Sequence, residues 1–200
     1  MTPTLQTDDL ILNEISAQDA EGIFHYASHE QIAKTTLWEA HRSIDDTLNY
    51  IQSTQKRICR EPGKLFLAWS VKDASTQQII GSVTLAQLAS WRVQIGFTFH
   101  YDHWMNQKPI HALQTIIQWA FSECLPFERI QARCFPQTVA SVALLERVGM
   151  KFEGVNRAMV KIEDQMVDLS CFAITRNDWN QLNARPDGWK ISFEGLQGRI

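Results

Sequence analysis

The chain of 200 residues lacks long hydrophobic runs. No stretch comes near the roughly 18 consecutive apolar residues that indicate a membrane-spanning helix. The N-terminal residues MTPTLQTDDLIL also lack the basic start and the apolar stretch of a secretory signal. These two absences exclude the usual membrane and export segments. We therefore expect a cytoplasmic protein with no membrane segment.

Basic charge is scarce as well. The chain has 19 lysines and arginines against 22 aspartates and glutamates, which gives a net charge of −3, and it has no run of basic residues. Proteins that bind nucleic acid usually carry a basic patch or stripe that neutralises phosphates. We therefore expect no nucleic-acid partner.

Cysteines are few and scattered. Cys59, Cys124, Cys134 and Cys171 form no C-x-x-C pair and no metal-type pattern with histidine. Free buried thiols are typical of proteins in a reducing compartment. We expect that state here, with no bound metal.

What remains is an ordinary globular composition, with 44% hydrophobic and 20% charged residues and no internal repeat. The length suits one substantial domain and is short for two. We expect residues 1–183 to form this domain. Residues 184–200 form a tail rich in glycine and polar residues, which the sequence does not place.

Residues 92–123 organise the chain. Their first part, RVQIGFTF, alternates apolar and polar residues like a half-buried strand, and IHALQTIIQWAFSE has the spacing of an amphipathic helix. Pro109 stands where the first turn of a helix accepts proline. A strand, a loop and a helix N-terminus in this order present free backbone N–H groups and a positive dipole end to an anion. The sequence therefore predicts the functional site in this stretch.

Two serine–acid pairs predict helix starts near the N-terminus. Ser16 with Asp19, and Ser43 with Asp46, each place an acid three residues after the serine, as a capping box does. The second helix is expected to end at residues 61–63, Glu-Pro-Gly. Its expected buried stripe is Ile44, Leu48, Ile51 and Ile58.

The other elements follow from the same periodicities. We expect strands at residues 9–15, 65–72, 78–88, 127–135, 150–162 and 167–175, and helices at 138–148, capped by Thr138, and 177–183. This order predicts an α+β (mixed α/β) fold with a single twisted, mostly antiparallel sheet and helices on both faces. The strand–helix–strand unit at 92–135 implies one parallel pair, where the sheet changes character and leaves a crevice for a ligand.

Several stretches together resemble a known family. They are the N-terminal part from DLILNEI to LNYI, the strands QIIGSVTL and QIGFTF, and the helix–glycine–strand stretch ASVALLERVGMKFEGVNR. In this order they resemble the GCN5-related N-acetyltransferase (GNAT) superfamily, over residues 7–180. The run Trp38, Glu39, His41, Arg42 and Ser43 is similar to its ribosomal-protein N-terminal acetyltransferase (Rim-type) branch.

The resemblance implies acetyl transfer from acetyl-CoA to a primary amine, either a small molecule or a protein N-terminus, by direct attack of the amine on the thioester. Backbone N–H groups of Phe97, Thr98 and Phe99 would stabilise the oxygen that becomes negative. Ser141 would act as the catalytic group that serves the leaving thiolate. The cofactor side would also include Thr138, where the family's helix usually begins with asparagine.

The resemblance also places the pyrophosphate of acetyl-CoA on the loop before the long helix. That loop consists of Met105, Asn106, Gln107, Lys108, Pro109 and Ile110.

This loop departs from the family pattern, Q/R-x-x-G-x-G/A, and is degenerate at all three defining positions of the aligned run WMNQKP. Gln107 adds a side chain where glycine lets the backbone approach phosphate, and Pro109 removes a donor. Lys108 and His111 could supply side-chain contacts to phosphate instead. The strand position that is often glutamate in this branch is Gln94, which cannot act as a general base.

Trp38, Glu39 and His41 are candidates for the side that binds the acceptor amine. The same residues also fit a packed aromatic ring, a solvated carboxylate and a surface histidine. Ser141, near the start of its helix, also fits a hydroxyl that bonds to local backbone groups. The sequence leaves both readings open for these residues.

Two functions of different class therefore remain. The first is an N-acetyltransferase that uses acetyl-CoA. The second is a GNAT-fold module that has lost turnover and binds another ligand or a protein partner, and the degenerate loop motivates it. The sequence also leaves both a monomer and a homodimer open.

Overall fold

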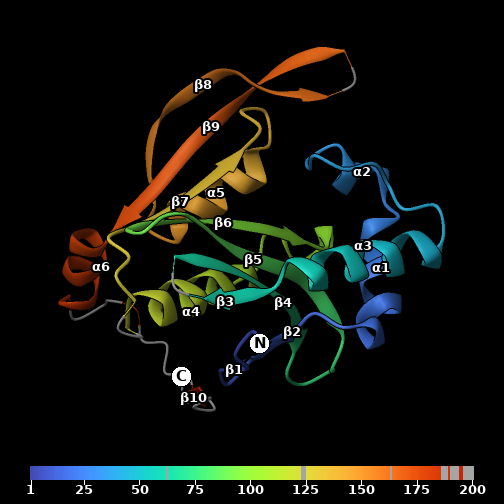
Figure 1. The fold of residues 1–200 in the computed structure, drawn as a ribbon, viewed down its shortest axis with the longest axis horizontal. Coiled ribbons are helices and arrows are strands. Elements are labelled where there is room, and N and C mark those ends of the chain that lie inside the picture. The colour runs from blue at the N-terminus through green and yellow to red at the C-terminus, as the bar shows by residue number, and fades with distance from the viewer. Residues whose placement is uncertain (62, 123–124, 163, 186–188, 190–193, 196–200) are drawn as a thin grey trace.

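The computed structural model describes residues 1–200 except 62, 123–124, 163, 186–188, 190–193 and 196–200. The strands in this part of the chain are β1 (Leu5–Gln6), β2 (Leu10–Glu14), β3 (Cys59–Glu61), β4 (Lys64–Asp73), β5 (Ile79–Ala89), β6 (Arg92–Phe99), β7 (Arg129–Cys134), β8 (Lys151–Ile162), β9 (Gln165–Thr175) and β10 (Glu194–Gly195). They form one sheet in the order β10-β1-β2-β4-β5-β6-β7-β9-β8, with β3 beside β4 (Figure 1). The β6–β7 pair is parallel and the other pairs are antiparallel, which confirms the predicted sheet.

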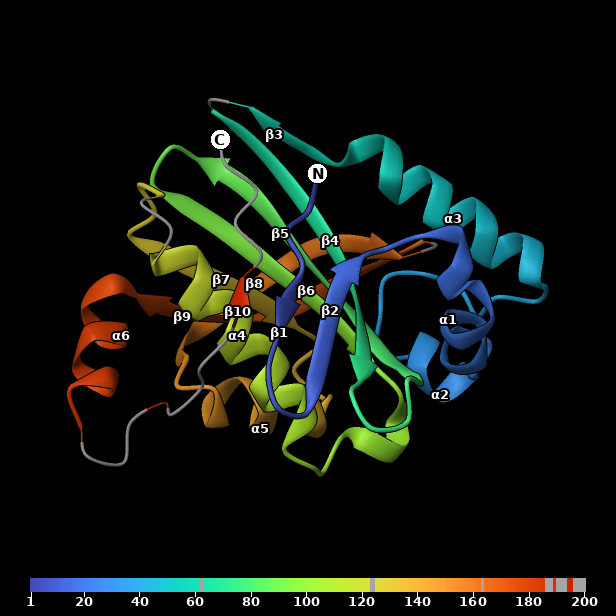
Figure 2. The same cartoon turned by 90° about the horizontal axis from the view of Figure 1, so that it is seen from below.

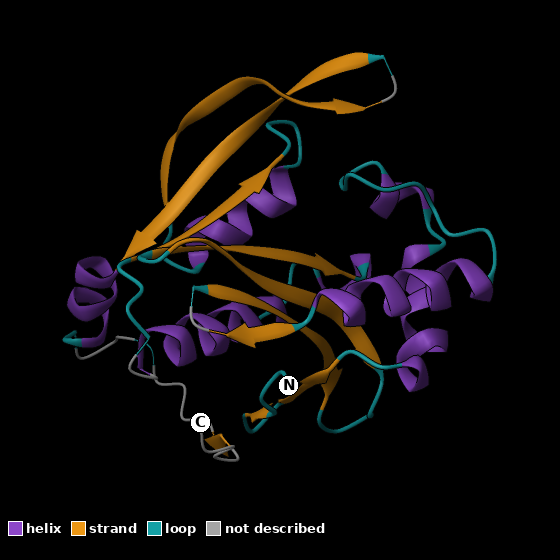
Figure 3. Cartoon of the chain, viewed as in Figure 1, coloured by secondary structure: helices purple, strands orange, loops and turns teal. Residues whose placement is uncertain are grey.

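Helices lie on both faces of this sheet, as predicted (Figures 2 and 3). They are α1 (Ala20–Ala27), α2 (Glu30–Ala33), α3 (Ile44–Arg57), α4 (Lys108–Ser122), α5 (Val139–Arg147) and α6 (Arg176–Asn183), with short 3₁₀ turns η1 (Ala17–Asp19) and η2 (Tyr101–His103). Two neighbouring residues of β4 pack on opposite faces of the sheet. Trp69 belongs to the core beneath α4 and α5, whereas Ala68 packs with α1 and α3.

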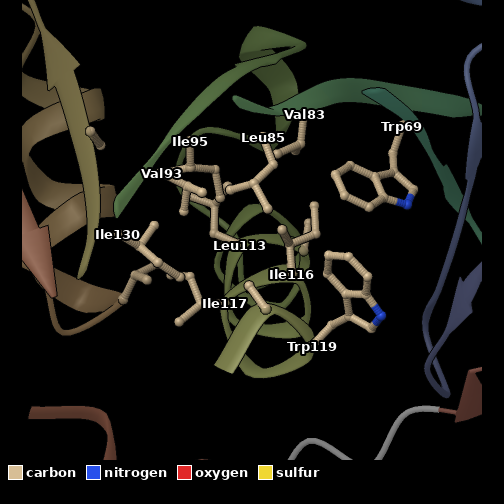
Figure 4. Packing of buried hydrophobic residues seen from close by; sticks show 14 of the residues in the cluster. Trp69, Val83, Leu85, Val93, Ile95, Leu113, Ile116, Ile117, Trp119 and Ile130 are labelled. Carbon is tan, nitrogen blue, oxygen red and sulfur yellow. The ribbon is translucent and has the colours of Figure 1, made fainter. Parts of the chain in front are cut away.

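The larger core lies between α4 and the sheet (Figure 4). Leu113, Ile116 and Ile117 of α4 are fully buried against apolar residues of the strands. The indole rings of Trp69 and Trp119 meet edge to face, with centroids 5.9 Å apart. The amphipathic pattern of residues 110–121 is therefore confirmed, and this packing fixes the helix that follows the candidate loop.

Helix ends agree with the sequence prediction in part. Ser43 and Asp46 form the predicted capping box, and Gly149 ends α5 with φ +93°, in the left-handed region that favours glycine. Thr138 precedes α5 as predicted, but its side chain makes no capping hydrogen bond, because its ψ of 80° departs from the extended geometry of a cap.

The predicted end of α3 at residues 61–63 is wrong. The helix ends at Arg57 because Cys59–Glu61 pair with β4 as a short strand. Gly63, with φ +78°, belongs to the turn between β3 and β4. Of the predicted stripe, Ile51 is buried, whereas Ile44 at the first turn is exposed. The long helix also starts earlier than predicted, at Lys108.

The parallel pair β6–β7 separates soon after it begins. Its paired positions run only from Arg92 opposite Arg129 to Gln94 opposite Gln131. Beyond Gln94, β6 stays paired with β5, and β7 stays paired with β9. The sheet therefore opens between the C-terminal halves of β6 and β7, where the sequence predicted a crevice.

The C-terminal residues are placed in part. β10 pairs antiparallel with β1, and Trp189 packs against the larger core. The rest of the tail after Arg185 lies outside the described residues, so a domain boundary at residue 183 stays a prediction.

The cysteines that the structure describes are free thiols. Cys134 is buried, and burial raises its pKa to about 11. Cys59 and Cys171 are partly exposed, and Cys124 lies outside the described residues. In the part of the chain that the structure covers, no helix has the length and apolar character needed to cross a membrane.

Four histidines gather where α1 meets the end of β6. His100 is only 5% exposed, stacks on His25 with ring centroids 4.9 Å apart, and meets His29 edge-on at 5.9 Å. His103 follows at 6.2 Å. The Asp102 N–H donates to Nδ1 of His100 (3.2 Å), so the proton of the neutral ring sits on Nε2. Burial lowers the pKa of His100, and the neighbouring histidines lower it further, against the opposing effect of Asp102.

This burial predicts that acid destabilises the protein. Because the pKa of His100 is lower in the folded chain, the unfolded chain binds more protons over that range, so the stabilisation is complete above the unfolded pKa of about 6.5 and is lost as the pH falls below it. Thermal denaturation at about pH 8 and about pH 5.5 should therefore show a smaller loss of Tm for His100→Gln than for the unsubstituted protein. Equal losses of Tm would contradict this prediction.

Candidate functional site

A cavity that is partly open to solvent lies where β6 separates from β7. Five of the predicted site residues line it, namely Phe97, Thr98, Phe99, Pro109 and Ser141. It is also lined by Thr35, Thr36, Trp104, Ala140 and Leu144, which sequence reasoning did not assign to a site. The structure thus brings the end of β6, the start of α4 and the first turn of α5 around one space.

The backbone groups of β6 alternate between its two neighbours. Thr98 is in register with β5, and the His100 N–H bonds to the Ile80 carbonyl on the same side (2.9 Å). In an antiparallel ladder the residues between these two bonded positions turn their N–H and C=O groups the other way. Phe97 and Phe99 therefore direct their backbone groups toward the opening, whereas Thr98 reaches the cavity through its side chain.

Trp104 engages one of these groups. Its indole Nε1–H donates to the carbonyl of Phe99 (2.9 Å), and the ring lines the cavity. The partner strand β7 pairs with β6 only as far as Gln94. Phe97 therefore has no strand partner on the cavity side, and its N–H is the backbone donor that a ligand carbonyl could reach.

Ser141 lies in the first turn of α5 and is partly exposed. Its hydroxyl makes no hydrogen bond with any described residue, and the residue lines the cavity. The alternative in which the hydroxyl bonds to local backbone groups is therefore not seen. Thr138 is buried one turn before it, contributes its carbonyl to the Val142 N–H (3.1 Å), and does not line the cavity.

The predicted phosphate loop is split by the start of α4. Met105, Asn106 and Gln107 form the loop, whereas Lys108, Pro109 and Ile110 already belong to the first helical turn. Asn106 holds the turn before the helix, because its Oδ1 accepts from the Lys108 N–H (3.0 Å). Its own N–H donates to the carbonyl of His103 (3.1 Å).

Three backbone donors remain at this end of α4. The N–H groups of Met105, Gln107 and Ile110 have no hydrogen-bond partner among the described residues, and proline removes the fourth. These donors coincide with the positive end of the helix dipole. Without its glycines, the loop still presents the groups that an anion would need.

The two basic side chains that could compensate for the missing glycines are engaged elsewhere. Lys108 Nζ forms an ion pair with the carboxylate of Asp73, and His111 Nδ1 lies 2.7 Å from that of Asp9. The bond from Lys108, together with hydrogen bonds from Ser75, lowers the pKa of Asp73. The expectation that Lys108 and His111 reach a phosphate is therefore not met, because both anchor α4 to the edge of the sheet.

A second cavity, which is open to solvent, lies next to the first. It is lined by Ala33, Lys34, Thr36, Leu37, Trp38, Phe135, Gln137, Ile162, Gln165 and Val167. Thr36 borders both cavities. Figure 1 shows the elements that surround it, with the tip of the β8–β9 hairpin above α2 and the segment that follows.

The three residues that were predicted to bind the acceptor amine differ in position. Trp38 lines the second cavity. Glu39 points to solvent, with 86% of its side chain exposed, and lies 3.7 Å from Arg42. His41 packs between Trp38 and Tyr50 and bonds through Nδ1 to the Thr47 hydroxyl (2.8 Å). Burial lowers the pKa of His41, and neither it nor Glu39 lines either cavity.

The histidines near β6 are poorly arranged for proton abstraction. His100 uses Nδ1 to accept from a backbone N–H, and its buried Nε2 has no partner among the described residues. In His103, Nδ1 faces the Asn106 amide nitrogen (2.9 Å), because the amide oxygen is held by Lys108 N–H. Both rings therefore have their lone pairs engaged. Among the described residues, no three histidine, cysteine or acidic side chains are grouped for a metal.

Comparison with known proteins agrees with this geometry. The sequence model described as "Acetyltransferase (GNAT) domain" matches residues 9–151. The chain is 29% identical over 178 residues to the uncharacterized N-acetyltransferase YoaA of Bacillus subtilis, covering 88% of this chain and 98% of YoaA.

Solved structures share the fold. A GNAT-family acetyltransferase from Bacillus anthracis superposes with a TM-score of 0.76 at 18% identity, over 87% of this chain and 99% of that one. Spermidine N-acetyltransferase from Vibrio cholerae, solved with CoA and spermine, superposes with a TM-score of 0.68 at 18% identity, over 85% and 97% of the two chains. The matched family domain spans β2 to the start of β8, so it contains the separated strands and the donors at α4. The chain belongs to the GNAT family of acetyltransferases and is an acyl-CoA N-acyltransferase.

Proposed function

We propose that the protein transfers the acetyl group of acetyl-CoA to a primary amine at the cavity between β6 and β7. The observation that carries this proposal is the convergence of three kinds of group on one space. The backbone of Phe97 lacks a strand partner there, and the hydroxyl of Ser141 makes no hydrogen bond with a described residue. The loop before α4 and its first turn, next to Pro109 in the cavity wall, carry three N–H groups without a partner among the described residues.

The residues present fit an acyl-CoA. The N–H groups of Met105, Gln107 and Ile110 would bind the pyrophosphate, with the dipole of α4 adding a favourable field. When bound, acetyl-CoA supplies an activated acetyl group. The thioester oxygen that becomes negative would accept from the Phe97 N–H, and preorganised donors of this kind contribute about 3–4 kcal/mol to transition-state stabilisation.

Ser141 would complete the reaction by donating a hydrogen bond to the sulfur of the departing thiolate. Its hydroxyl lies in the same cavity as Phe97 and has no competing partner in the described chain. The side chains of Thr98 and Phe99 line the same space and would position the acetyl group. Thr138, which carries the first turn of α5, would act only through the placement of Ser141.

The acceptor amine would enter through the second cavity, because the two cavities meet at Thr36. Trp38 would contact it, while Glu39 and His41 would act at most from outside the cavity. Among the described residues, no aspartate, glutamate or histidine lines either cavity. The reactive form would therefore be the neutral amine, with its proton lost to water. A protein N-terminus, as in the Rim-type branch, and a small amine both remain acceptors of this kind, in a cytoplasmic monomer or homodimer.

A second function is favoured by one observation. Lys108 and His111 are tied to Asp73 and Asp9, so the loop carries neither the family's glycines nor replacement side chains for phosphate. A GNAT-fold module that binds another ligand without turnover would tolerate such a loop.

Calorimetry with acetyl-CoA and assays of thiol release with a set of amines test the proposed function. We expect a dissociation constant below about 1 mM, the upper end of usual substrate affinities, and thiol release that depends on the amine. Binding of acetyl-CoA without thiol release for any amine would favour the inactive module instead.

Replacement of Ser141 by alanine should lower kcat by about 10²-fold, the lower range for loss of a proton donor, and leave acetyl-CoA affinity nearly unchanged. Ser53→Ala is the matched control, since Ser53 is an exposed helical serine on α3 that bonds to the Tyr50 carbonyl. Steady-state kinetics and calorimetry on both variants separate the two effects. An unchanged kcat in Ser141→Ala would remove this residue from the chemistry.

The double variant Gln107→Gly with Pro109→Ala tests the loop. Because three N–H groups are already free, restoring the fourth should raise acetyl-CoA affinity by less than about tenfold, or about 1.4 kcal/mol. The single variant Gln107→Ala separates the effect of losing the glutamine side chain from the effect of the greater backbone freedom of glycine. A much larger rise in affinity would indicate that the natural loop serves another ligand.

A further inference from the structure

The second cavity has walls of a distinct chemical character. Most of its lining is apolar, contributed by Ala33, Leu37, Trp38, Phe135, Ile162 and Val167. The polar lining consists of Thr36, Gln137 and Gln165. Lys34 supplies the only charge that these residues carry. The lining therefore combines six apolar residues with three neutral polar residues and one positive charge.

No acidic side chain is among the described residues that line this space. Glu39, which follows Trp38 in sequence, points to solvent beside Arg42. Asp164, at the turn of the β8–β9 hairpin, is fully exposed and lies 3.2 Å from Lys161, and Glu163 lies outside the described residues. Lys34 forms no ion pair with any described residue. An acceptor with several positive charges would lose hydration here without gaining a counter-charge.

At the junction of the two cavities, the hydroxyl of Thr36 is already used as a hydrogen-bond donor. Its Oγ1 donates to the carbonyl of Ala33 (2.9 Å), and the carbonyl of Trp38 lies at 3.3 Å. Thr35 likewise donates to the carbonyl of Ile32 (2.7 Å). Both hydroxyls donate to carbonyls in the turn after α2, so neither is a free donor for whatever enters.

We propose that the acceptor is a monoamine with a bulky apolar or aromatic group and an anionic group, and that polyamines are poor acceptors. The apolar group would lie between Leu37 and Trp38, the anionic group would meet Lys34, and the amine would point past Thr36 toward the first cavity. The expected preference in acetylation rests on the proposed function. The expected preference in binding does not depend on turnover.

Three amines test the proposed acceptor class. L-phenylalanine carries both the apolar and the anionic group, L-phenylalaninamide lacks the anionic group, and spermidine is a polyamine without either. We expect kcat/KM for acetylation, calculated on the concentration of neutral amine because the amino group of the amide is less basic, to be several-fold higher for L-phenylalanine than for its amide, since a partly exposed ion pair with Lys34 adds modestly. We expect both to exceed spermidine by about 100-fold, which is the selectivity that a site without a counter-charge can impose. A kcat/KM for spermidine equal to or above that of L-phenylalanine would overturn the inference.

Variants of the cavity wall provide the second test. Leu37 is 60% exposed, so Leu37→Asp adds a carboxylate to the wall without opening the core, and it should reduce the preference for L-phenylalanine over spermidine by at least tenfold. Leu88→Asp is the matched control, because Leu88 on β5 is 44% exposed and lines neither cavity. Lys34→Gln should abolish the difference between L-phenylalanine and its amide, and Lys56→Gln on α3 should not. An unchanged preference in Leu37→Asp would overturn the inference.

Calorimetry with L-phenylalanine separates failure of this inference from failure of the proposed function. Binding that Leu37→Asp weakens, without acetylation of any amine, supports the acceptor class and rejects the transfer reaction. Acetylation that favours spermidine rejects the acceptor class and supports the transfer reaction. If L-phenylalanine is neither bound nor acetylated, the acceptor class is wrong, and acetyl-CoA binding then decides on the cofactor site.

Discussion

The early end of the parallel pairing between β6 and β7 is the constraint on which the rest of the site depends. A strand inside a sheet normally has partners on both sides, because buried N–H and C=O groups are costly without them. After Gln94, β6 keeps only β5, so the groups of its second half on the other side need new partners. Trp104 supplies one by donating to the Phe99 carbonyl. The N–H of Phe97 is left for a ligand, and the cavity forms around it because the two strands diverge there.

The position of α4 links this strand end to a second set of donors. Packing of Leu113, Ile116 and Ile117 against the sheet fixes the axis of the helix, while Lys108 and His111 pin its first turn to Asp73 and Asp9. Their charges therefore secure the position of the helix end, and the bare N–H groups supply the attraction for an anion. If this loop binds the pyrophosphate as proposed, rigidity of the helix start would take the place of the flexibility that glycines would give.

Periodicity and capping signals predict most of this fold from sequence, since alternation in β6 and the helical stripe of α4 are each set by local burial. The capping box of Ser43 and the left-handed Gly149 were predictable for the same reason, because each depends on a few adjacent residues. The strand β3 was missed because its pairing with β4 depends on a contact outside the local helix pattern. The engagement of Lys108 by Asp73, 35 residues away, and the lining by Thr36 likewise need the tertiary structure.

The segment after α2 couples the two cavities. Thr35 and Thr36 line the first cavity, and Thr36, Leu37 and Trp38 line the second. His29 is the N-cap of α2, and its ring lies against the rings of His100 and Tyr101, with centroids 5.9 and 5.0 Å away. His100 directly follows the strand that carries Phe97. The wall of the second cavity and the end of β6 are thus linked through the contacts of His29 with His100 and Tyr101. In the proposed reaction, a shift of α2 that widened the second cavity would also change the space around the thioester, so that selectivity for the amine and alignment of the acetyl group would depend on the same packing.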